Sequence, residues 1–272
     1  LPIFFVGLFD WLEQASYLKT YHIMPIFDSV KCLLQSLHNT FFPRYCCVCG
    51  RRLMVNEEDL CISCLASLPF TDLNGEKGNV VERLLWDDKL STERADSMLF
   101  YRPKSKYCNL YFQFKYYDNP DLAVHLGQIM ARRLLQTDFF KDIDCIIPVP
   151  LSKQRYQQRG YNQSERLAQG ISIETGIEVN TTAVLRMVDN PSQTHLSQSE
   201  RMQNVKDIFC LADAAAIQGK HILLVDDMIT TGSTTRACAR VLVEAGNVKI
   251  SVVSLGLSSR NQHRKFPHWI RP

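Results

Sequence analysis

Two adjacent aspartates, Asp226 and Asp227, directly follow the apolar run Ile222–Val225. Carboxylates at the end of a buried strand are costly unless a ligand needs them. The next residues, "MITTGST", supply hydroxyl groups, and Gly232 among them lets backbone amides approach an anion closely. A helix that begins in this loop adds oriented N–H groups and positive potential, which suits a phosphate. The acids and the loop together predict a sugar phosphate site, with carboxylates on the hydroxyls and amides on the phosphate.

This stretch has two other interpretations. The loop lacks the lysine and the glycine spacing of a P-loop, which argues against nucleoside triphosphate chemistry of that type. A plain strand, turn and helix, with Asp227 or a threonine as N-cap, is the bland alternative. The apolar strand, both acids and the hydroxyl-rich loop occur in one register, and this combination favours a ligand site.

The elements that must position this loop alternate along the second half of the chain. Apolar strands are expected at 143–150, 183–188, 207–212, 221–225 and 248–257, and helices at 120–136, 161–176 and 233–246. Apolar strands alternating with helices predict an α/β fold, with a doubly wound, mainly parallel sheet covered on both faces. Ligands of such sheets bind beyond the carboxyl ends of the strands, at a topological switch point. We therefore expect the site at the loops after Pro150 and Val225.

Four cysteines form two C-x-x-C pairs, Cys46 with Cys49 and Cys61 with Cys64, and eleven residues separate the pairs. Four such thiolates can surround one ion tetrahedrally, which predicts a structural Zn²⁺ site with no position left for water. The gap is shorter than the roughly fifteen to twenty residues that are usual, and Cys47 is a competing ligand. A thioredoxin-like redox motif is disfavoured because the flanking βαβ context is missing.

Composition adds few constraints. The chain has 272 residues, 46% hydrophobic and 22% charged, as in soluble globular proteins, and its net charge of +3 does not argue for nucleic acid or membrane. The apolar run at residues 1–9 has neither the basic region nor the cleavage site of a signal peptide, and is too short to span a bilayer. We expect natural translation to start at Met24, with an amphipathic leader of unknown role as the alternative. We also expect a soluble, cytoplasmic protein without membrane insertion.

The stretch "YFQFKYY", which contains Lys115, supports two interpretations. Aromatic rings beside positive charge can stack on nucleic acid bases. Such a cluster is more often packing within the core or against a helix, which we favour.

The stretch "ILLVDDMITTGST" resembles the phosphoribosyl pyrophosphate (PRPP) binding motif of type I phosphoribosyltransferases. The stretches "IIPVPLSKQRYQQRGYNQSERLA" and "PSQTHLSQSERMQNVKDIF" resemble the ComF/GntX family, also described as competence-protein-F-like amidophosphoribosyltransferases. The resemblance covers about Tyr45 to Leu257, with the motifs in the family's order, and the family carries a similar N-terminal cysteine module.

The resemblance implies a role for each matching residue. Asp226 and Asp227 would bind the ribose hydroxyls of PRPP. Its 5′-phosphate would be held by Thr230, Thr231, Gly232, Ser233 and Thr234, and Met228 and Ile229 would also belong to the PRPP-binding set. Pyrophosphate would lie on Val149, Pro150 and Leu151, with Lys153 and either Arg155 or Arg159 neutralising it. The family signature would comprise Arg159, Gly160, Tyr161, Asn162 and Gln163. A hood over the site would contain Gln193, Leu196, Ser197, Arg201 and Asn204. The catalytic set would be Asp226, Asp227, Lys153, Arg159 and Arg201.

The implied activity is Mg²⁺-dependent transfer of a phosphoribosyl group, with pyrophosphate release, to an unidentified acceptor in nucleotide metabolism. One alternative is a PRPP-binding accessory factor for DNA uptake in natural transformation, with single-stranded DNA or a competence helicase as partner. Another is a PRPP-sensing regulator without catalysis. The expected division is an N-terminal extension at 1–40, a cysteine module at 41–70, a phosphoribosyltransferase-like domain at 71–262 and a tail at 263–272. The sequence predicts no oligomeric state.

Overall fold

A computed structural model describes residues 43–258 except 89, 91, 117–118 and 188–207. The described residues fall into two units, one with residues 43–46 and 51–61, the other with 47–50 and 62–258. Several predictions lie outside the described residues: the extension at 1–40 with its start at Met24, the tail at 263–272, and the hood residues Gln193, Leu196, Ser197, Arg201 and Asn204.

The first unit is held by short-range backbone pairing. Tyr45 and Arg52 form an isolated antiparallel bridge, and the Cys46 N–H donates to the Arg51 carbonyl at 2.8 Å. The side chain of Arg51 also pairs with Glu57 at 2.5 Å. The bridge and the backbone bond reverse the chain around the first C-x-x-C motif, without a regular sheet in the part of the unit that is described.

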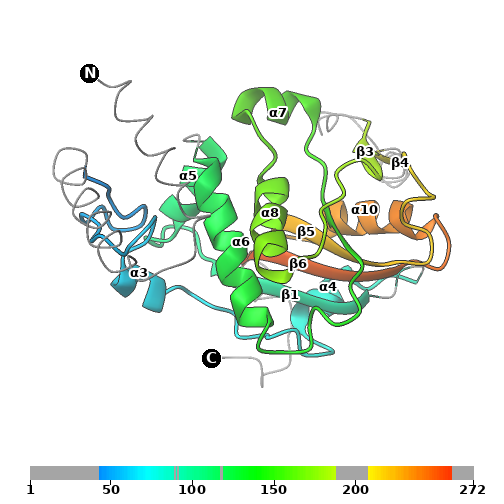
Figure 1. Ribbon diagram of the computed structural model, residues 1–272, viewed down its shortest axis with the longest axis horizontal. Coiled ribbons are helices and arrows are strands. Elements are labelled where there is room, and N and C mark those ends of the chain that lie inside the picture. Colours follow the sequence, from blue (N-terminus) through cyan, green and yellow to red (C-terminus); the bar gives the residue numbers. More distant parts are fainter. Residues whose placement is uncertain (1–42, 89, 91, 117–118, 188–207, 259–272) are drawn as a thin grey trace, which may run out of the picture. The chain divides into compact units, whose positions relative to one another are not determined.

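The second unit is built on a four-stranded parallel sheet (Figure 1). Its strand order is β1-β6-β5-β2, with bounds Thr92–Tyr101 for β1, Lys249–Ser258 for β6, His221–Ile229 for β5 and Cys145–Pro148 for β2. Every neighbouring pair is parallel. The α/β fold class is confirmed, and the strands expected at 143–150, 221–225 and 248–257 are present.

Helices cover the two faces of this sheet. Helix α8 (Gln163–Thr175) packs against α6 (Pro120–Leu134) and against β2 and β5. Apolar residues of α4 (Val80–Leu85) and α10 (Ser233–Val243) form one core with Ile222 and Leu224 of β5. Because side chains alternate along a strand, α6 and α8 lie on the face opposite α4 and α10.

Local signals set the ends of these helices. Asn119 caps α6, and Asp121 lies in its first turn. Gly176 ends α8 in the left-handed conformation at φ 73°, which glycine adopts at little cost. Shorter elements complete the unit: α3 (Ile62–Ala66), α5 (Cys108–Tyr116), α7 (Lys153–Arg159), and the antiparallel pair β3 (Val184–Arg186) and β4 (Phe209–Leu211).

Strand β5 is longer than the sequence suggested. We expected it to end at Val225, but it continues to Ile229 because Asp226 pairs with Ser254 and Met228 with Gly256 of β6. The aspartates therefore lie within a paired strand, and the loop that follows is correspondingly shorter.

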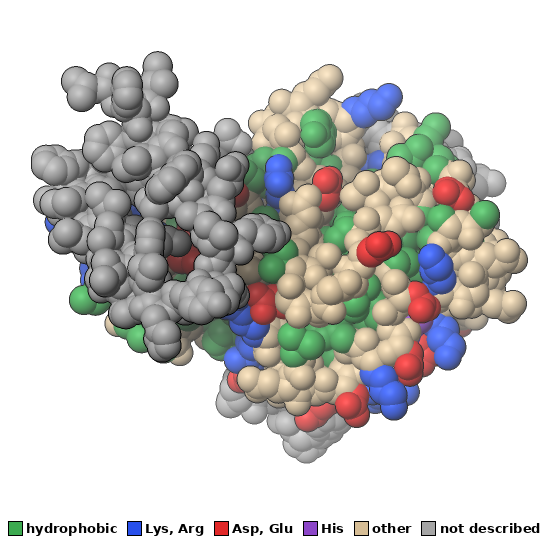
Figure 2. Space-filling view, in the orientation of Figure 1, with side chains coloured by type: hydrophobic (Ala, Val, Ile, Leu, Met, Phe, Trp, Pro, Cys, Tyr) green, Lys and Arg blue, Asp and Glu red, His purple; other side chains and the backbone are tan. Residues whose placement is uncertain are grey.

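On the face drawn in Figure 2, the acidic and basic side chains that the structure describes are interspersed rather than gathered by sign. In the described part of the chain, no helix combines the length and the hydrophobicity that crossing a membrane would require.

Candidate functional site

The alternation of β5 sends its two aspartates in opposite directions. Asp226 has the parity of Ile222 and Leu224, so its side chain lies on the α10 side of the sheet. There the Thr235 hydroxyl donates to Asp226 Oδ2 at 2.6 Å, and the Asp227 N–H donates to Asp226 Oδ1 at 2.9 Å. Both oxygens of this buried carboxylate therefore already accept a hydrogen bond.

Burial also changes the acidity of Asp226. Loss of hydration is the main cause that raises its pKa to about 6, and the neighbouring Asp227 carboxylate adds to the effect. The hydrogen bond from Thr235 acts in the opposite direction. A cation or a proton donor placed beside Asp226 would therefore change the protonation of its carboxyl group near neutral pH.

Asp227 faces the other side of the sheet and pairs with a residue that the sequence did not indicate. Lys115 Nζ, on the last turn of α5, lies 2.9 Å from Asp227 Oδ2, and both side chains are 19% exposed. Lys115 attracted attention only as part of an aromatic stretch. Helix α5 thus supplies a cation near the carboxyl-terminal end of β5.

The loop between β5 and α10 presents hydroxyl groups to solvent. Thr230, Thr231, Ser233 and Thr234 are exposed, and Thr231 Oγ1 lies 3.0 Å from Ser233 Oγ. Gly232 is the N-cap of α10 at φ 73°, and no side chain caps this helix. The alternative in which Asp227 or a threonine is the N-cap is therefore wrong. The Ser233 N–H donates to Thr231 Oγ1 at 3.4 Å, while the N-cap glycine itself has no side chain, and a phosphate ligand suits such a helix start.

The loop after β2 lies next to the aspartates. The Val149 N–H donates to the Val225 carbonyl at 2.8 Å, so the strand pairing continues into this loop. Asn162, the N-cap of α8, donates from Nδ2 to the Val149 carbonyl at 3.1 Å. Arg159 Nη1, at the end of α7, donates to Gln163 Oε1 at 2.8 Å. These bonds fix the start of α8 and an arginine against the loop.

One cavity of about 300 Å³ joins these parts. It is lined by Lys115, Val149, Pro150, Leu151, Arg155, Arg159, Asn162, Gln163, Ser164, Arg186, Asp226, Asp227, Met228, Thr230 and Thr234. The described lining thus holds four cationic side chains and two carboxylates, which suits a polyanionic ligand that also carries hydroxyl groups.

The structure brings most of the predicted site residues together. The exceptions among the described residues do not line the cavity: Lys153, Gly160, Tyr161, Ile229, Thr231, Gly232 and Ser233. Lys153 is exposed at the start of α7, and Ile229 is buried at the end of β5. Lys115, Ser164 and Arg186 were missed. A single arginine in the apolar stretch "AVLRMV" was the one local signal for Arg186.

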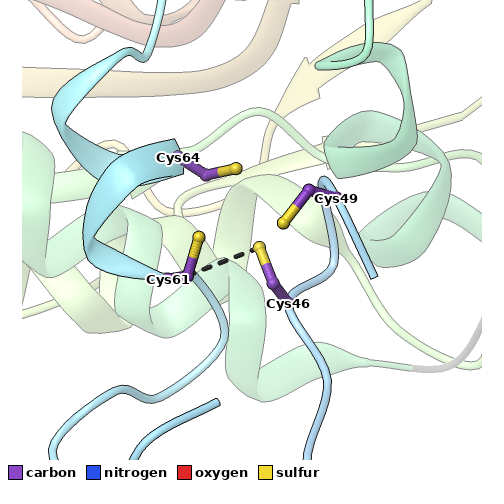
Figure 3. A group of neighbouring side chains, drawn as sticks. All are labelled: Cys46, Cys49, Cys61 and Cys64. Atoms are coloured by element: carbon purple, nitrogen blue, oxygen red, sulfur yellow. Dashed lines mark hydrogen bonds between the residues drawn. The ribbon is translucent and has the colours of Figure 1, made fainter. Parts of the chain in front are cut away.

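The four predicted metal ligands also come together. The Sγ atoms of Cys46, Cys49, Cys61 and Cys64 all lie within 4.8 Å of one another (Figure 3). A tetrahedral Zn²⁺ with Zn–S bonds of about 2.3 Å needs sulfurs about 3.8 Å apart, so this cluster needs only a small contraction. Cys47 does not belong to it. The cluster therefore fits a structural Zn²⁺ site.

Comparisons with known proteins identify the family of this chain. Residues 119–270 match the phosphoribosyl transferase domain. Competence protein F of Haemophilus influenzae is 33% identical over 79% of this chain and 84% of its own length. DNA utilization protein YhgH of Salmonella typhi is 31% identical over 53% of this chain, and the match spans 63% of that relative's length.

Among solved structures, glutamine phosphoribosylpyrophosphate amidotransferase from B. subtilis is 22% identical, with 52% of this chain and 30% of that chain covered and a TM-score of 0.36. The domain match covers more than half of the chain, and the competence protein F match covers more than two thirds. The chain therefore belongs to the phosphoribosyl transferase domain family, in the group that includes competence protein F, as the resemblance of its motifs indicated.

Proposed function

We propose that the chain binds PRPP in the 300 Å³ cavity and transfers its phosphoribosyl group to an acceptor, with release of pyrophosphate. The observation that carries this proposal is the lining itself, in which two strand-end carboxylates and four cationic side chains surround one cavity. A ligand with ribose hydroxyls and several phosphates complements such a wall, because hydroxyls donate to carboxylates and phosphates accept from cations.

Each part of the wall then has a role. Asp227 accepts from the ribose hydroxyls, and the loop of Thr230 and Thr234, with the start of α10, holds the 5′-phosphate. Arg155 and Arg159 lie on the β2 side and neutralise the pyrophosphate group. Mg²⁺ prefers carboxylate and phosphate oxygens, so Asp227 is a suitable protein ligand, and the ion would neutralise charge on the leaving group.

The protein has little covalent work in this reaction. A nitrogen of the acceptor attacks C1 of the ribose, and the bond from C1 to the pyrophosphate oxygen breaks, so that pyrophosphate leaves with the electron pair. Positive charge develops at C1 while negative charge grows on the leaving group. The carboxylates stabilise the positive charge at C1, and the arginines stabilise the negative charge on the pyrophosphate. Because these side chains are held in fixed positions, both stabilising effects are large.

Calorimetric titration of the full chain with PRPP and Mg²⁺ tests the binding step. Asp227→Asn is expected to weaken PRPP binding at least about tenfold, the effect of one charge-assisted hydrogen bond. Asp121→Asn, at the exposed start of α6, is the matched control and should bind as the unaltered chain does. Equal affinity of Asp227→Asn and the unaltered chain would refute the assignment.

A screen for pyrophosphate release against nucleobases, ammonia and single-stranded oligonucleotides tests transfer. The names of two relatives, competence protein F and DNA utilization protein YhgH, favour one second candidate, a PRPP-binding accessory factor for DNA uptake. Tight PRPP binding with no pyrophosphate release from any acceptor, together with binding of a single-stranded oligonucleotide, would favour that candidate over the enzyme.

A further inference from the structure

The side-chain amide of Gln163 is a buried polar group for which the roles above provide no use. Gln163 begins α8, is 1% exposed and lines the cavity. Its Oε1 accepts from Arg159 Nη1 at 2.8 Å. Its Nε2 has no hydrogen-bond partner within the part of the chain that the structure describes. Buried N–H donors almost always have a partner, so this one requires an explanation.

The orientation of the amide is not arbitrary. A guanidinium group can only donate, so the oxygen of Gln163 must face Arg159 and the nitrogen must point elsewhere. Exchanging the two atoms would set two donors against each other and leave the oxygen without a bond. The Nε2 group is therefore held as a donor beside the cavity, because Oε1 of the same amide is bonded to Arg159.

We propose that Gln163 Nε2 is a ligand-binding donor, and that its acceptor is an oxygen of the pyrophosphate group of PRPP. This inference rests on the proposed function. Arg155 and Arg159 line the same cavity, and the N-terminus of the 13-residue helix α8 adds positive potential. An anionic oxygen is the acceptor that such surroundings favour over a neutral hydroxyl.

The position of α8 assigns the acceptor to pyrophosphate and not to the 5′-phosphate. Asn162, directly before Gln163, donates to the Val149 carbonyl and so fixes the start of α8 to the loop after β2. The hydroxyl-rich loop that suits the 5′-phosphate follows β5, and its Thr230 and Thr234 form a separate part of the lining. Gln163 consequently donates to the pyrophosphate leaving group.

The variant Gln163→Met tests this inference in the full chain, because methionine has a similar size and no donor. Calorimetry in the presence of Mg²⁺ uses three probes: PRPP, inorganic pyrophosphate and ribose 5-phosphate. Affinity for PRPP and for pyrophosphate should fall roughly 10- to 100-fold, as expected for the loss of a donor to a charged oxygen. Affinity for ribose 5-phosphate should stay the same, and the melting temperature without ligand should not fall.

The same helix offers a matched control. Arg166 Nη1 donates to Gln169 Oε1 at 3.1 Å, an equivalent pair whose residues do not line the cavity. Gln169→Met should leave all three affinities unchanged. A second variant, Gln163→Glu, retains an acceptor for Arg159 and removes the donor, so pyrophosphate binding should be weakened as in Gln163→Met.

Three results would overturn the inference. The first is unchanged pyrophosphate affinity in Gln163→Met, and the second is an equal loss for ribose 5-phosphate. The third is full pyrophosphate affinity in Gln163→Glu, which would make Gln163 only a positioning residue for Arg159. Absence of PRPP binding by the unaltered chain would instead refute the proposed function, while its pyrophosphate titrations still test Gln163. Binding of neither ligand would refute both.

Discussion

The ion pair between Lys115 and Asp227 yields the most stringent quantitative prediction. Its atoms Nζ and Oδ2 are 2.9 Å apart, and each side chain is 19% exposed. Replacing Lys115 by methionine leaves the Asp227 carboxylate without the Lys115 cation. The neighbouring carboxyl group of Asp226 already has a raised pKa. Replacing Asp227 by asparagine leaves a largely buried ammonium group. Each single variant should therefore be destabilised beyond the loss of the contact itself.

The size of the coupling follows from the distance and the burial. At an effective dielectric constant of about 20, two unit charges 2.9 Å apart attract each other by about 6 kcal/mol. Desolvation of both groups offsets much of this gross value, since most of each side chain is removed from water. A net coupling free energy of about 1 to 3 kcal/mol remains, within the range measured for contacting residues.

A double-mutant cycle measures this coupling. Urea unfolding of Lys115→Met, Asp227→Asn and the double variant should show the double variant less destabilised than the sum of the singles. The exposed pair Arg132–Glu174, at 2.7 Å with Arg132 58% exposed, is the matched control and should give a smaller coupling that salt reduces further. A Lys115–Asp227 coupling no larger than that of the control pair would refute this account of the site.

Three further predictions concern other parts of the chain. A Cβ at Gly170 would lie 2.0 Å from the Val124 carbonyl oxygen, so Gly170→Ala should force α6 and α8 apart and lower the free energy of unfolding by about 1 to 3 kcal/mol in urea titration. Burial raises the pKa of Asp96 to about 6. The folded state therefore binds this proton more tightly than the unfolded chain, and stability should fall as pH rises from about 4 to about 6; Asp96→Asn should flatten that slope in melting experiments. Cys64→Ser should lose bound zinc in elemental analysis and melt at a lower temperature. Cys47→Ser should keep the zinc content and the melting temperature of the unaltered chain.

Local patterns in the sequence were sufficient for the centre of the fold. The apolar stretches of β2, β5 and β6 and the periodic faces of α6, α8 and α10 each contain their own signal within a few residues. The end of α8 was predictable for the same reason, because Gly176 accepts a positive φ that other residues avoid. Such features need no knowledge of distant partners.

Strand β1 was not predicted because its sequence carries charged residues that obscure the strand pattern. Glu93, Arg94 and Asp96 interrupt its apolar run, yet Asp96 is 4% exposed. The Gly75 N–H, which donates to Asp96 Oδ2 at 2.6 Å, provides part of the compensation for this burial. Gly75 is distant in sequence, so no local window could reveal it.

The residues of the site also divide into those that the sequence predicted and those that it did not. Its two loops follow strands and were predictable from topology, whereas Lys115 and Arg186 reach the cavity from elements that sequence order does not place there. Lys115 is on a helix whose aromatic residues gave the dominant pattern. A cation of this kind becomes visible only when the tertiary structure brings it to a carboxylate.

The pair of aspartates illustrates what strand geometry adds to a motif. In sequence, Asp226 and Asp227 are equivalent candidates for the ribose hydroxyls, but adjacent residues of a paired strand must face opposite sides of the sheet. Asp226 is bonded to Thr235 of α10 and to the backbone of Asp227, so its carboxylate shapes the loop to which we assign the phosphate. Under the proposed function, Asp227 would exchange Lys115 for a ligand hydroxyl, and the lysine would turn to a phosphate. A change at Asp226 should therefore act through the geometry of the loop, and a change at Asp227 through direct contact with the ligand.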